Sequence, residues 1–193
     1  MRKINFKDLR VQRTLAAIDD VFIGLILDKT YKDITVSEIC NLANIRRKTF
    51  YSYYDSLDDL LAEKITSITK NYLKRIYQYD VPRNIKEINT EFYCYSEEQG
   101  PFYERIVCCQ DYNLIGNNFL QDIVKKTWEN STWFNNLDYY HQNIILAFMF
   151  HTGGGIYRQW VQDGKNIPLA SIISYSENLL CAGFDGFMTN AIK

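Results

Sequence analysis

The chain has 193 residues, enough for one or two domains with a sizeable hydrophobic core. Hydrophobic residues make up 47% and charged residues 23% of the sequence, which is typical of a globular protein rather than a disordered or fibrous one. No apolar run is long enough to span a membrane, and no apolar signal segment follows the N-terminal cations, so we expect a soluble, cytoplasmic protein without a membrane partner.

The net charge of −1 hides a difference between the two ends of the chain. Residues 1–55 hold ten Lys and Arg against seven Asp and Glu, whereas the remainder holds 12 basic and 16 acidic residues. A basic N-terminal part joined to an acidic body is typical of a protein that contacts phosphate at one end only.

The cysteines and histidines lack the spacing of a metal site. None of the five cysteines forms a C-x-x-C pair, and His141 and His151 are not four residues apart. No Ser/His/Asp order and no nucleotide motif can be placed, so we expect no metal, no cofactor and no enzymatic activity. Reduced, mostly buried thiols are the favoured interpretation, and a redox-sensitive Cys108–Cys109 disulfide is the alternative.

The first predicted helix covers residues 8–28. Its apolar residues recur at helical spacing and form a wide stripe for a core. They are Leu15, Ile18, Val21, Phe22, Leu25 and Ile26. A polar connection follows, in which Tyr31 and Ile34 are expected to cover the bottom of a small core.

The stretch that follows the connection predicts two short helices joined by a tight turn. Thr35 and Glu38 form a capping box at the start of the first, whose apolar face is Val36, Ile39, Leu42 and Ala43. Asn44 tolerates the left-handed conformation that such a turn needs.

The second short helix begins with Arg46-Arg47-Lys48-Thr49, three cations and a hydroxyl. Phe50 and Tyr54, four residues apart, are expected to face the core. A short helix with a cationic first turn, packed on a preceding helix, is the helix-turn-helix arrangement that reads DNA.

The segment resembles the DNA-binding domain of the TetR (tetracycline repressor) family of transcriptional regulators. The resemblance rests on T-V-S-E-I-C-N-L-A-N-I, on the T-F-Y string at Thr49 with its following aromatic pair, and on Asp58-Asp59-Leu60-Leu61. Arg46 and Tyr53 depart from the family pattern, which usually has a small cap residue and often a His there.

The resemblance implies a division of roles among the DNA-contacting residues. Arg47 and Lys48 are expected to read bases, and Arg46 to bind a base or a phosphate. Phosphate or backbone contacts are expected from Thr35, Thr49, Tyr51 and Tyr53.

A long helix over residues 56–79, begun by a near capping box from Ser56 to Asp59, is expected to belong to both halves of the chain. The remaining predicted helices cover residues 84–98, 102–109, 119–130, 139–163 and 169–190. Pro82 is expected to open the first of them, and a break at Gly100-Pro101 separates it from the second. A break at 110–117 precedes the third helix, and a loop at 131–138 follows it. The prediction is an all-α protein of about nine helices, resembling the TetR architecture from end to end. Its expected domains are a DNA-binding domain, residues 1–55, and an effector-binding and dimerisation domain, residues 56–193.

The resemblance also implies pairing with a second copy through the last two helices. The expected interface residues are Phe148, Thr152, Gly153, Ile156, Tyr157, Trp160, Leu179, Leu180, Gly183, Phe184 and Phe187. For the run Gly153-Gly154-Gly155, close helix packing is the favoured interpretation, with a helix break or a kink facing a pocket as the alternative.

An effector cavity in the body is implied in the same way, because aromatic walls with a few polar groups suit one. The expected lining is Phe92, Tyr95, Phe102, Arg105, Trp128, Phe148 and His151.

These features together predict a ligand-responsive homodimeric repressor that binds double-stranded DNA at a palindromic operator and a small-molecule effector in its body. The alternative is a regulator with the same fold that acts as an activator, or through a protein partner, without a small-molecule switch.

Overall fold

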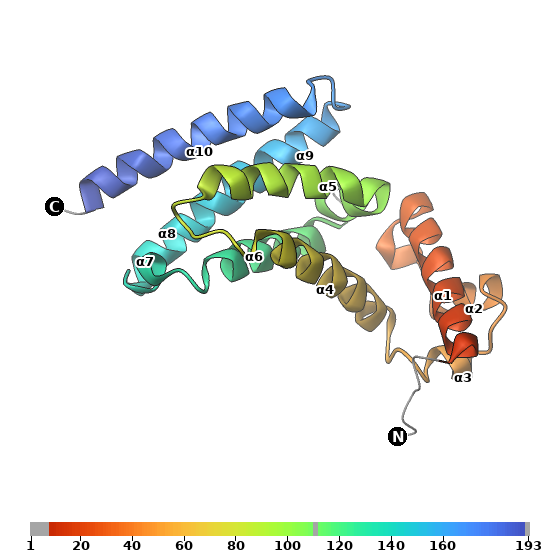
Figure 1. Ribbon diagram of the computed structural model, residues 1–193. Coiled ribbons are helices and arrows are strands. Elements are labelled where there is room, and N and C mark those ends of the chain that lie inside the picture. Colours follow the sequence, from red (N-terminus) through yellow and green to blue (C-terminus); the bar gives the residue numbers. More distant parts are fainter. Residues whose placement is uncertain (1–7, 110–111, 192–193) are drawn as a thin grey trace. The chain divides into compact units, whose positions relative to one another are not determined.

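The computed structural model describes residues 8–109 and 112–191, apart from the side chains of residues 113–114, 184 and 186–191 (Figure 1). Every regular element in these ranges is helical, which confirms the all-α prediction. The elements are α1 (Leu9–Asp28), η1 (Tyr31–Asp33), α2 (Val36–Leu42), α3 (Arg47–Phe50), α4 (Leu57–Ile76), α5 (Ile85–Cys108), α6 (Asn113–Trp128), α7 (Thr132–Asn135), α8 (Tyr139–Met149), η3 (Phe150–Gly154), α9 (Gly155–Gln162) and α10 (Leu169–Ala191).

The chain divides into two compact units, Met1–Thr66 and Ser67–Lys193, which we call the head and the body. The division falls inside α4, so this one helix contributes residues to both units. The expected domain boundary after residue 55 stays a prediction.

The head is a small helical cluster with a fully buried apolar centre. The Asp8 carboxylate caps α1 by accepting a hydrogen bond from the backbone N–H of Arg10, at 2.8 Å. Side chains with no exposed surface come from α1, α2, α3 and the start of α4: Ile18, Phe22, Ile26, Ile39, Phe50 and Leu60. The apolar spacing that predicted the first helix therefore also predicted its buried face.

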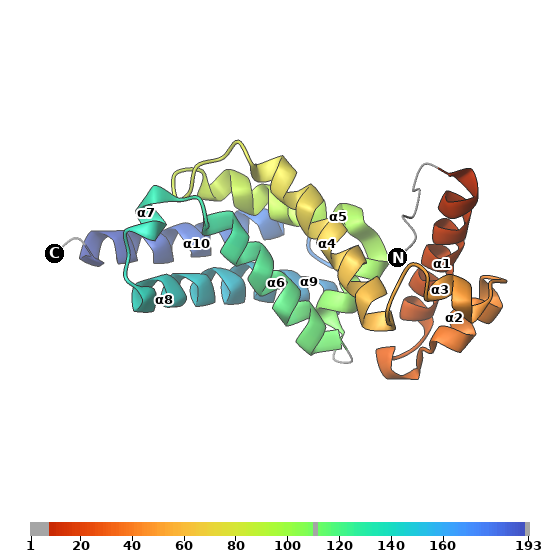
Figure 2. The same cartoon turned by 90° about the horizontal axis from the view of Figure 1, so that it is seen from below.

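The body is arranged around α5, which contacts α6, α9 and α10. Helices α8 and α9 run on as one rod through η3, and α10 lies along that rod (Figures 1 and 2). Gly100 interrupts the helical conformation of α5 with φ of 66°, a conformation that favours glycine. The predicted break is therefore present, as a local irregularity inside α5.

Three predictions of local structure in the body were wrong. Pro82 lies in a turn before α5 and not in its first turn, and α6 begins at Asn113 instead of residue 119. The early start is possible because Gly116 has no side chain where α6 meets α5: a Cβ there would lie 2.3 Å from the Ile106 carbonyl oxygen. The predicted loop at 131–138 contains α7, capped by the Ser131 hydroxyl.

The three consecutive glycines do not all serve close packing. Gly153 and Gly154 end the π-helical turn η3, where α8 passes into α9. Only Gly154 is close-packed, since a Cβ added to it would lie 3.1 Å from the Leu120 side chain, whereas a Cβ at Gly153 or Gly155 would meet nothing within 4 Å. The run therefore forms a π-helical turn within a continuous rod, where Gly153 and Gly154 line a cavity of the body, and close packing accounts for Gly154 only. Turns of this kind are frequent at functional sites.

Candidate functional site

The turn of the helix-turn-helix is held by local hydrogen bonds and one ion pair. The Thr35 hydroxyl accepts from the backbone N–H of Glu38 at 3.2 Å, as predicted. The Glu38 carboxylate does not complete the capping box, because it pairs with the Lys29 ammonium group at 2.5 Å. Asn44 has φ of 53°, so it adopts the left-handed conformation expected of it.

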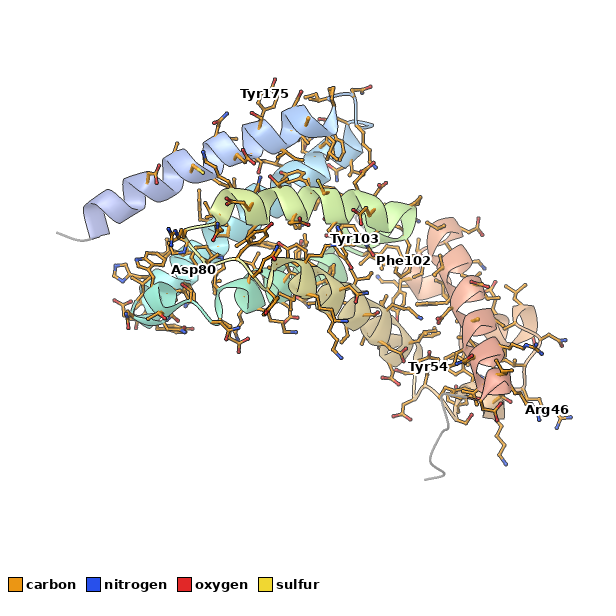
Figure 3. All side chains as sticks on the ribbon, viewed as in Figure 1. Arg46, Tyr54, Asp80, Phe102, Tyr103 and Tyr175 are labelled. Atoms are coloured by element: carbon orange, nitrogen blue, oxygen red, sulfur yellow. The ribbon has the colours of Figure 1, made fainter. Side chains whose placement is uncertain are left out.

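The cationic turn that starts α3 is open to solvent. Arg46, Arg47 and Lys48 are all exposed, and within the described residues none of them forms an ion pair or a side-chain hydrogen bond. Figure 3 shows the Arg46 side chain pointing away from the helices of the head. Three such cations on adjacent positions can approach a phosphate backbone without first breaking a contact.

The aromatic residues after the cations alternate between core and surface. Phe50 and Tyr54 are 0% and 3% exposed, which confirms their predicted core role, and burial raises the pKa of the Tyr54 hydroxyl. Tyr51 is 49% exposed and packs its ring edge-on against Phe50, with centroids 5.6 Å apart. Thr49 and Tyr53 are half-buried, and Thr35 is exposed.

One apolar residue of α2 is exposed to solvent, although it was expected to be buried. Leu42 was expected in the apolar stripe of α2, yet 60% of its surface is exposed. It is the last residue of the helix, and the chain turns away directly after it, so little is left to cover its side chain.

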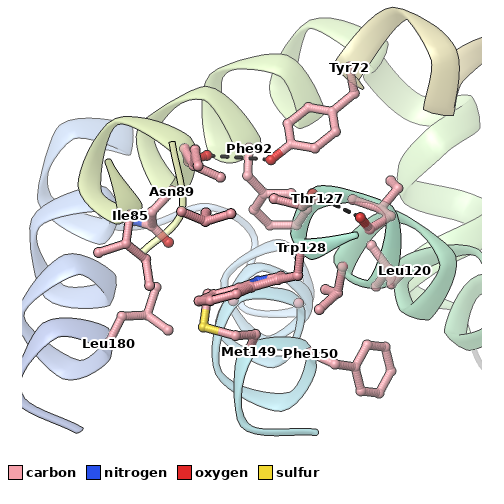
Figure 4. A pocket seen from close by; sticks show the side chains of 16 residues that line it. Tyr72, Ile85, Asn89, Phe92, Leu120, Thr127, Trp128, Met149, Phe150 and Leu180 are labelled. Carbon is pink, nitrogen blue, oxygen red and sulfur yellow. Dashed lines mark hydrogen bonds between the residues drawn. The ribbon is translucent and has the colours of Figure 1, made fainter. Parts of the chain in front are cut away.

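A second feature is a cavity inside the body with a volume of about 50 Å³ (Figure 4). Its lining comes from α4, the turn before α5, α5, α6, α8, η3 and α10: Tyr72, Val81, Ile85, Ile88, Asn89, Phe92, Leu120, Ile123, Val124, Thr127, Trp128, Met149, Phe150, Gly153, Gly154 and Leu180. None of these residues carries a charged side chain. Ligand sites are commonly about 300–1,000 Å³, so this cavity is too small for a typical ligand unless its lining moves.

Two of the seven predicted effector residues, Phe92 and Trp128, line this cavity. His151 is exposed and lines a different surface pocket. The Tyr95 hydroxyl donates a hydrogen bond to the Ile68 carbonyl at 2.8 Å. The other predicted residues that do not line it are Phe102, Arg105 and Phe148. Aromatic content alone could not locate the cavity, because most aromatic residues of the body pack against one another.

Apart from Phe92, the stripe of α5 that faces the cavity was missed from the sequence. Ile85, Ile88, Asn89 and Phe92 recur at helical spacing, which is the signal that could have found it. Asn89 is the polar member of that stripe and is 5% exposed.

The predicted dimer residues separate into core and surface. Tyr157, Trp160 and Leu180 are at most 5% exposed within the chain, so they belong to the core of the body, and their predicted role in a dimer interface stays a prediction. Gly153 lines the cavity instead. Leu179 and Gly183 are exposed, whereas Phe148, Thr152 and Ile156 are half-buried, and the side chains of Phe184 and Phe187 lie outside the described part of the chain.

Exposed apolar residues lie on both α8 and α10, and we call them together the exposed apolar face. Tyr140 and Ile144 on α8 are 75% and 60% exposed, and Tyr175 and Leu179 on α10 are 55% and 59% exposed. Each pair is four residues apart and so lies on one side of its helix. The Phe148 ring of α8 approaches α10 at Gly183, where an added Cβ would lie 2.7 Å from the ring. Figure 3 shows Tyr175 pointing outward from α10.

Two other classes of site are not found in the described ranges. Within residues 8–109 and 112–191, no three His, Cys, Asp or Glu side chains gather as a set of metal ligands. In the same ranges no helix combines the length and the hydropathy required to cross a membrane.

Comparison with known proteins connects the fold to a group of regulators. A structure of a TetR transcriptional regulator from Streptococcus agalactiae superposes with a TM-score of 0.65, covering 90% of this chain and 97% of that one at 20% identity. This chain has the TetR fold. The FadR regulator of Bacillus subtilis, solved with stearoyl-CoA, gives a TM-score of 0.57 over 86% of this chain and 96% of that one at 18% identity.

Sequence comparison is narrower than the structural one. The chain is 41% identical over 59 residues to YxbF, an uncharacterised helix-turn-helix transcriptional regulator of Bacillus subtilis. That match covers 30% of this chain and only 16% of the relative's length. No protein-family model matches the chain. The TetR resemblance of the helix-turn-helix is thus confirmed as a resemblance of fold over 90% of the chain.

Proposed function

We propose that the protein is a DNA-binding transcriptional regulator that acts as a homodimer in the cytoplasm and represses from a palindromic operator. The observation that carries the proposal is the exposed cationic turn of residues 46–48 on a helix-turn-helix of TetR fold. Arg47 and Lys48 would enter the major groove and read base edges, while Thr35, Thr49, Tyr51 and Tyr53 would fix the register on phosphates.

Dimerisation follows from the weakness of one head. A single helix-turn-helix with a few phosphate contacts binds DNA poorly at physiological salt, so two heads must act together. The exposed apolar face of α8 and α10 is the surface that we assign to the second copy, because an apolar patch of this kind on a globular protein is typically an interface. Half-sites would then lie about one helical turn apart, or somewhat more.

The body cavity would receive a small-molecule effector. Tyr72 on α4 is 2% exposed and lines the cavity, and Leu60 and Leu61 on the same helix are buried in the head. A ligand that displaces Tyr72 would therefore act on a helix shared by both units, and it would shift the population between states that differ in operator affinity. The lining of the cavity includes no cation to meet the phosphates of a CoA ligand, so we do not transfer the ligand of the FadR structure to this chain.

The DNA-binding proposal is tested by selecting duplexes from a random pool and then measuring affinity for the selected sequence. We expect a palindrome, and we expect Arg47→Ala/Lys48→Ala to weaken binding by at least tenfold, because a lost base contact alone costs about 1–3 kcal/mol. The slope of log affinity against log salt should also become shallower in this variant, since fewer phosphates are neutralised.

The matched control for this variant is Lys70→Ala/Lys74→Ala. It removes the same charge from exposed positions on α4 in the body. We expect it to bind the selected duplex within about twofold of wild type, because long-range charge is screened at physiological salt. Equal affinities of the two double variants would refute the assignment of the site.

A further inference from the structure

One residue of the cavity lining has a polar group whose hydrogen-bonding capacity is unused among the described residues. The Asn89 side-chain oxygen accepts a hydrogen bond from the Ser176 hydroxyl at 2.9 Å, which ties α5 to α10. The Asn89 Nδ2 amide group is buried and has no hydrogen-bond partner among the described residues. A buried donor without an acceptor is rare in native proteins and is costly to maintain.

The other polar groups in the lining are already occupied. The Thr127 hydroxyl donates to the Ile123 carbonyl at 2.8 Å, and the Tyr72 hydroxyl approaches the Ile88 carbonyl at 3.5 Å (Figure 4). Asn89 is therefore the residue of the lining with a free donor, and Figure 4 shows it beside Ile85, on the same side of the site as Leu180.

The other residues of the cavity lining determine which chemical groups a ligand can carry. They are apolar and aromatic, and no side chain among them is charged. A carboxylate or phosphate placed there would lose its hydration without gaining a counter-ion, which excludes charged ligands on energetic grounds.

On these observations we infer that the effector is an uncharged, mainly hydrocarbon molecule with one acceptor oxygen, such as a ketone, ester or ether, which accepts a hydrogen bond from Asn89 Nδ2. The inference rests on the proposed function, since it specifies the effector of that regulator. Apolar contact with Phe92 and Trp128 supplies affinity, and Asn89 discriminates between ligands with and without an acceptor.

Entry of such a ligand requires the lining to move, because about 50 Å³ holds only a few water molecules. Met149 is the side chain suited to that movement. It lies beside the Trp128 ring in Figure 4, and its three rotatable bonds let it vacate space at low cost.

The test uses three probes of similar size: acetophenone, which has an acceptor, isopropylbenzene, which has none, and benzoate, which is charged. Each is titrated by calorimetry into the wild-type protein and into Met149→Ala, in which the cavity is larger. We expect acetophenone to bind about threefold to tenfold more tightly than isopropylbenzene, as for one neutral hydrogen bond, and benzoate not to bind. The Asn89 side-chain amide resonance in a ¹H–¹⁵N spectrum should shift with acetophenone only.

The control variant is Asn89→Leu/Ser176→Ala, which removes both partners of the buried hydrogen bond together and leaves neither unsatisfied. It should bind both neutral probes equally, with isopropylbenzene as in wild type, and binding of that probe also shows that the cavity is intact. Ser176→Ala alone should keep the preference for acetophenone.

The inference is overturned if acetophenone and isopropylbenzene bind equally to wild type, if benzoate is preferred, or if no probe binds to either protein. Affinity for the selected duplex is measured on the same samples. Loss of probe preference with intact DNA binding rejects the effector inference alone. Absent DNA binding with the probe preference kept rejects the regulator proposal, and the cavity is then a ligand site without the role of an effector site.

Discussion

Two adjacent residues at the end of α3 differ in burial and in their expected role. Phe50 is fully buried and anchors the turn, while Tyr51 beside it keeps 49% of its surface exposed and supports its ring on Phe50. The core side chain fixes the direction of the exposed one, because rings packed edge-on restrict each other's rotation. Removing the Tyr51 hydroxyl alone would thus test a phosphate contact without disturbing the core.

The adjacent cysteines also differ at the level of single residues. Cys108 is 5% exposed, and burial, reinforced by Glu104, raises the pKa of its thiol to about 12. Cys109 is half-buried, and its sulfur accepts a hydrogen bond from Arg105 at 3.5 Å. A thiol that stays protonated is neither a good nucleophile nor a redox sensor, so the structure favours the interpretation of reduced, buried thiols.

Treatment of the native protein with N-ethylmaleimide at pH 8 should leave Cys108 unmodified while Cys109 reacts. Because burial raises the pKa of the Cys108 thiol far above 8, the thiol stays protonated at that pH, and the side chain is covered as well. Peptide mapping by mass spectrometry measures the modification of each residue. In guanidinium chloride both residues should react, and equal native rates would contradict the assignment.

The packing of α6 on α5 depends on a single missing side chain. Gly116 is buried, and a Cβ there would lie 2.3 Å from the Ile106 carbonyl oxygen and 2.9 Å from the Val107 Cα. Both neighbours are backbone atoms of α5, so neither can rotate away as a side-chain terminus could. The two helices must separate if this glycine is replaced.

Gly116→Ala should therefore destabilise the body by about 1–3 kcal/mol, the usual cost of overpacking. Urea unfolding followed by tryptophan fluorescence measures the effect, because all three tryptophans belong to the body. Gly155→Ala is the matched control: its Cβ meets nothing within 4 Å, so alanine should be neutral or stabilise by up to about 1 kcal/mol. Equal stabilities of the two variants would mean that α6 and α5 do not approach as closely as described.

At the scale of the whole molecule, the exposed apolar residues of α8 and α10 form the surface that we assign to the second copy. The Phe148 ring of α8 approaches α10 at Gly183, so the two helices are neighbours there. Exposed apolar side chains on neighbouring helices are what a four-helix bundle between two copies requires.

Ile144→Glu/Leu179→Glu should convert the proposed dimer to a monomer, because both positions lie in that face and burying two carboxylates per copy is strongly unfavourable. Sedimentation velocity measures the state, and circular dichroism checks the fold. The affinity of this variant for a palindromic duplex should also fall, since each head of a monomer binds DNA alone. Tyr77→Glu, at an 86% exposed position after α4, is the control and should stay dimeric. A double variant that sediments like wild type would place the interface elsewhere.

The sequence by itself determined the local structure of the head. The Thr35 cap, the left-handed Asn44 and the core positions of Phe50 and Tyr54 depend on neighbours within a few residues, and the structure confirms all of them. The exposed Leu42 was missed because its burial depends on where the chain goes after the helix ends.

The cavity and the exposed face were decided only by tertiary structure. Side chains from five α-helices and η3 line the cavity, and the sequence alone predicted only Phe92 and Trp128 among them. Asn89 was not predicted, because its role depends on Ser176 of α10, which binds the side-chain oxygen and leaves the Nδ2 amide group without a partner. Helical spacing likewise could not separate Leu179 on the surface from Leu180 in the core. Periodicity gives the apolar side of a helix, but which neighbours cover that side depends on contacts between residues far apart in the chain.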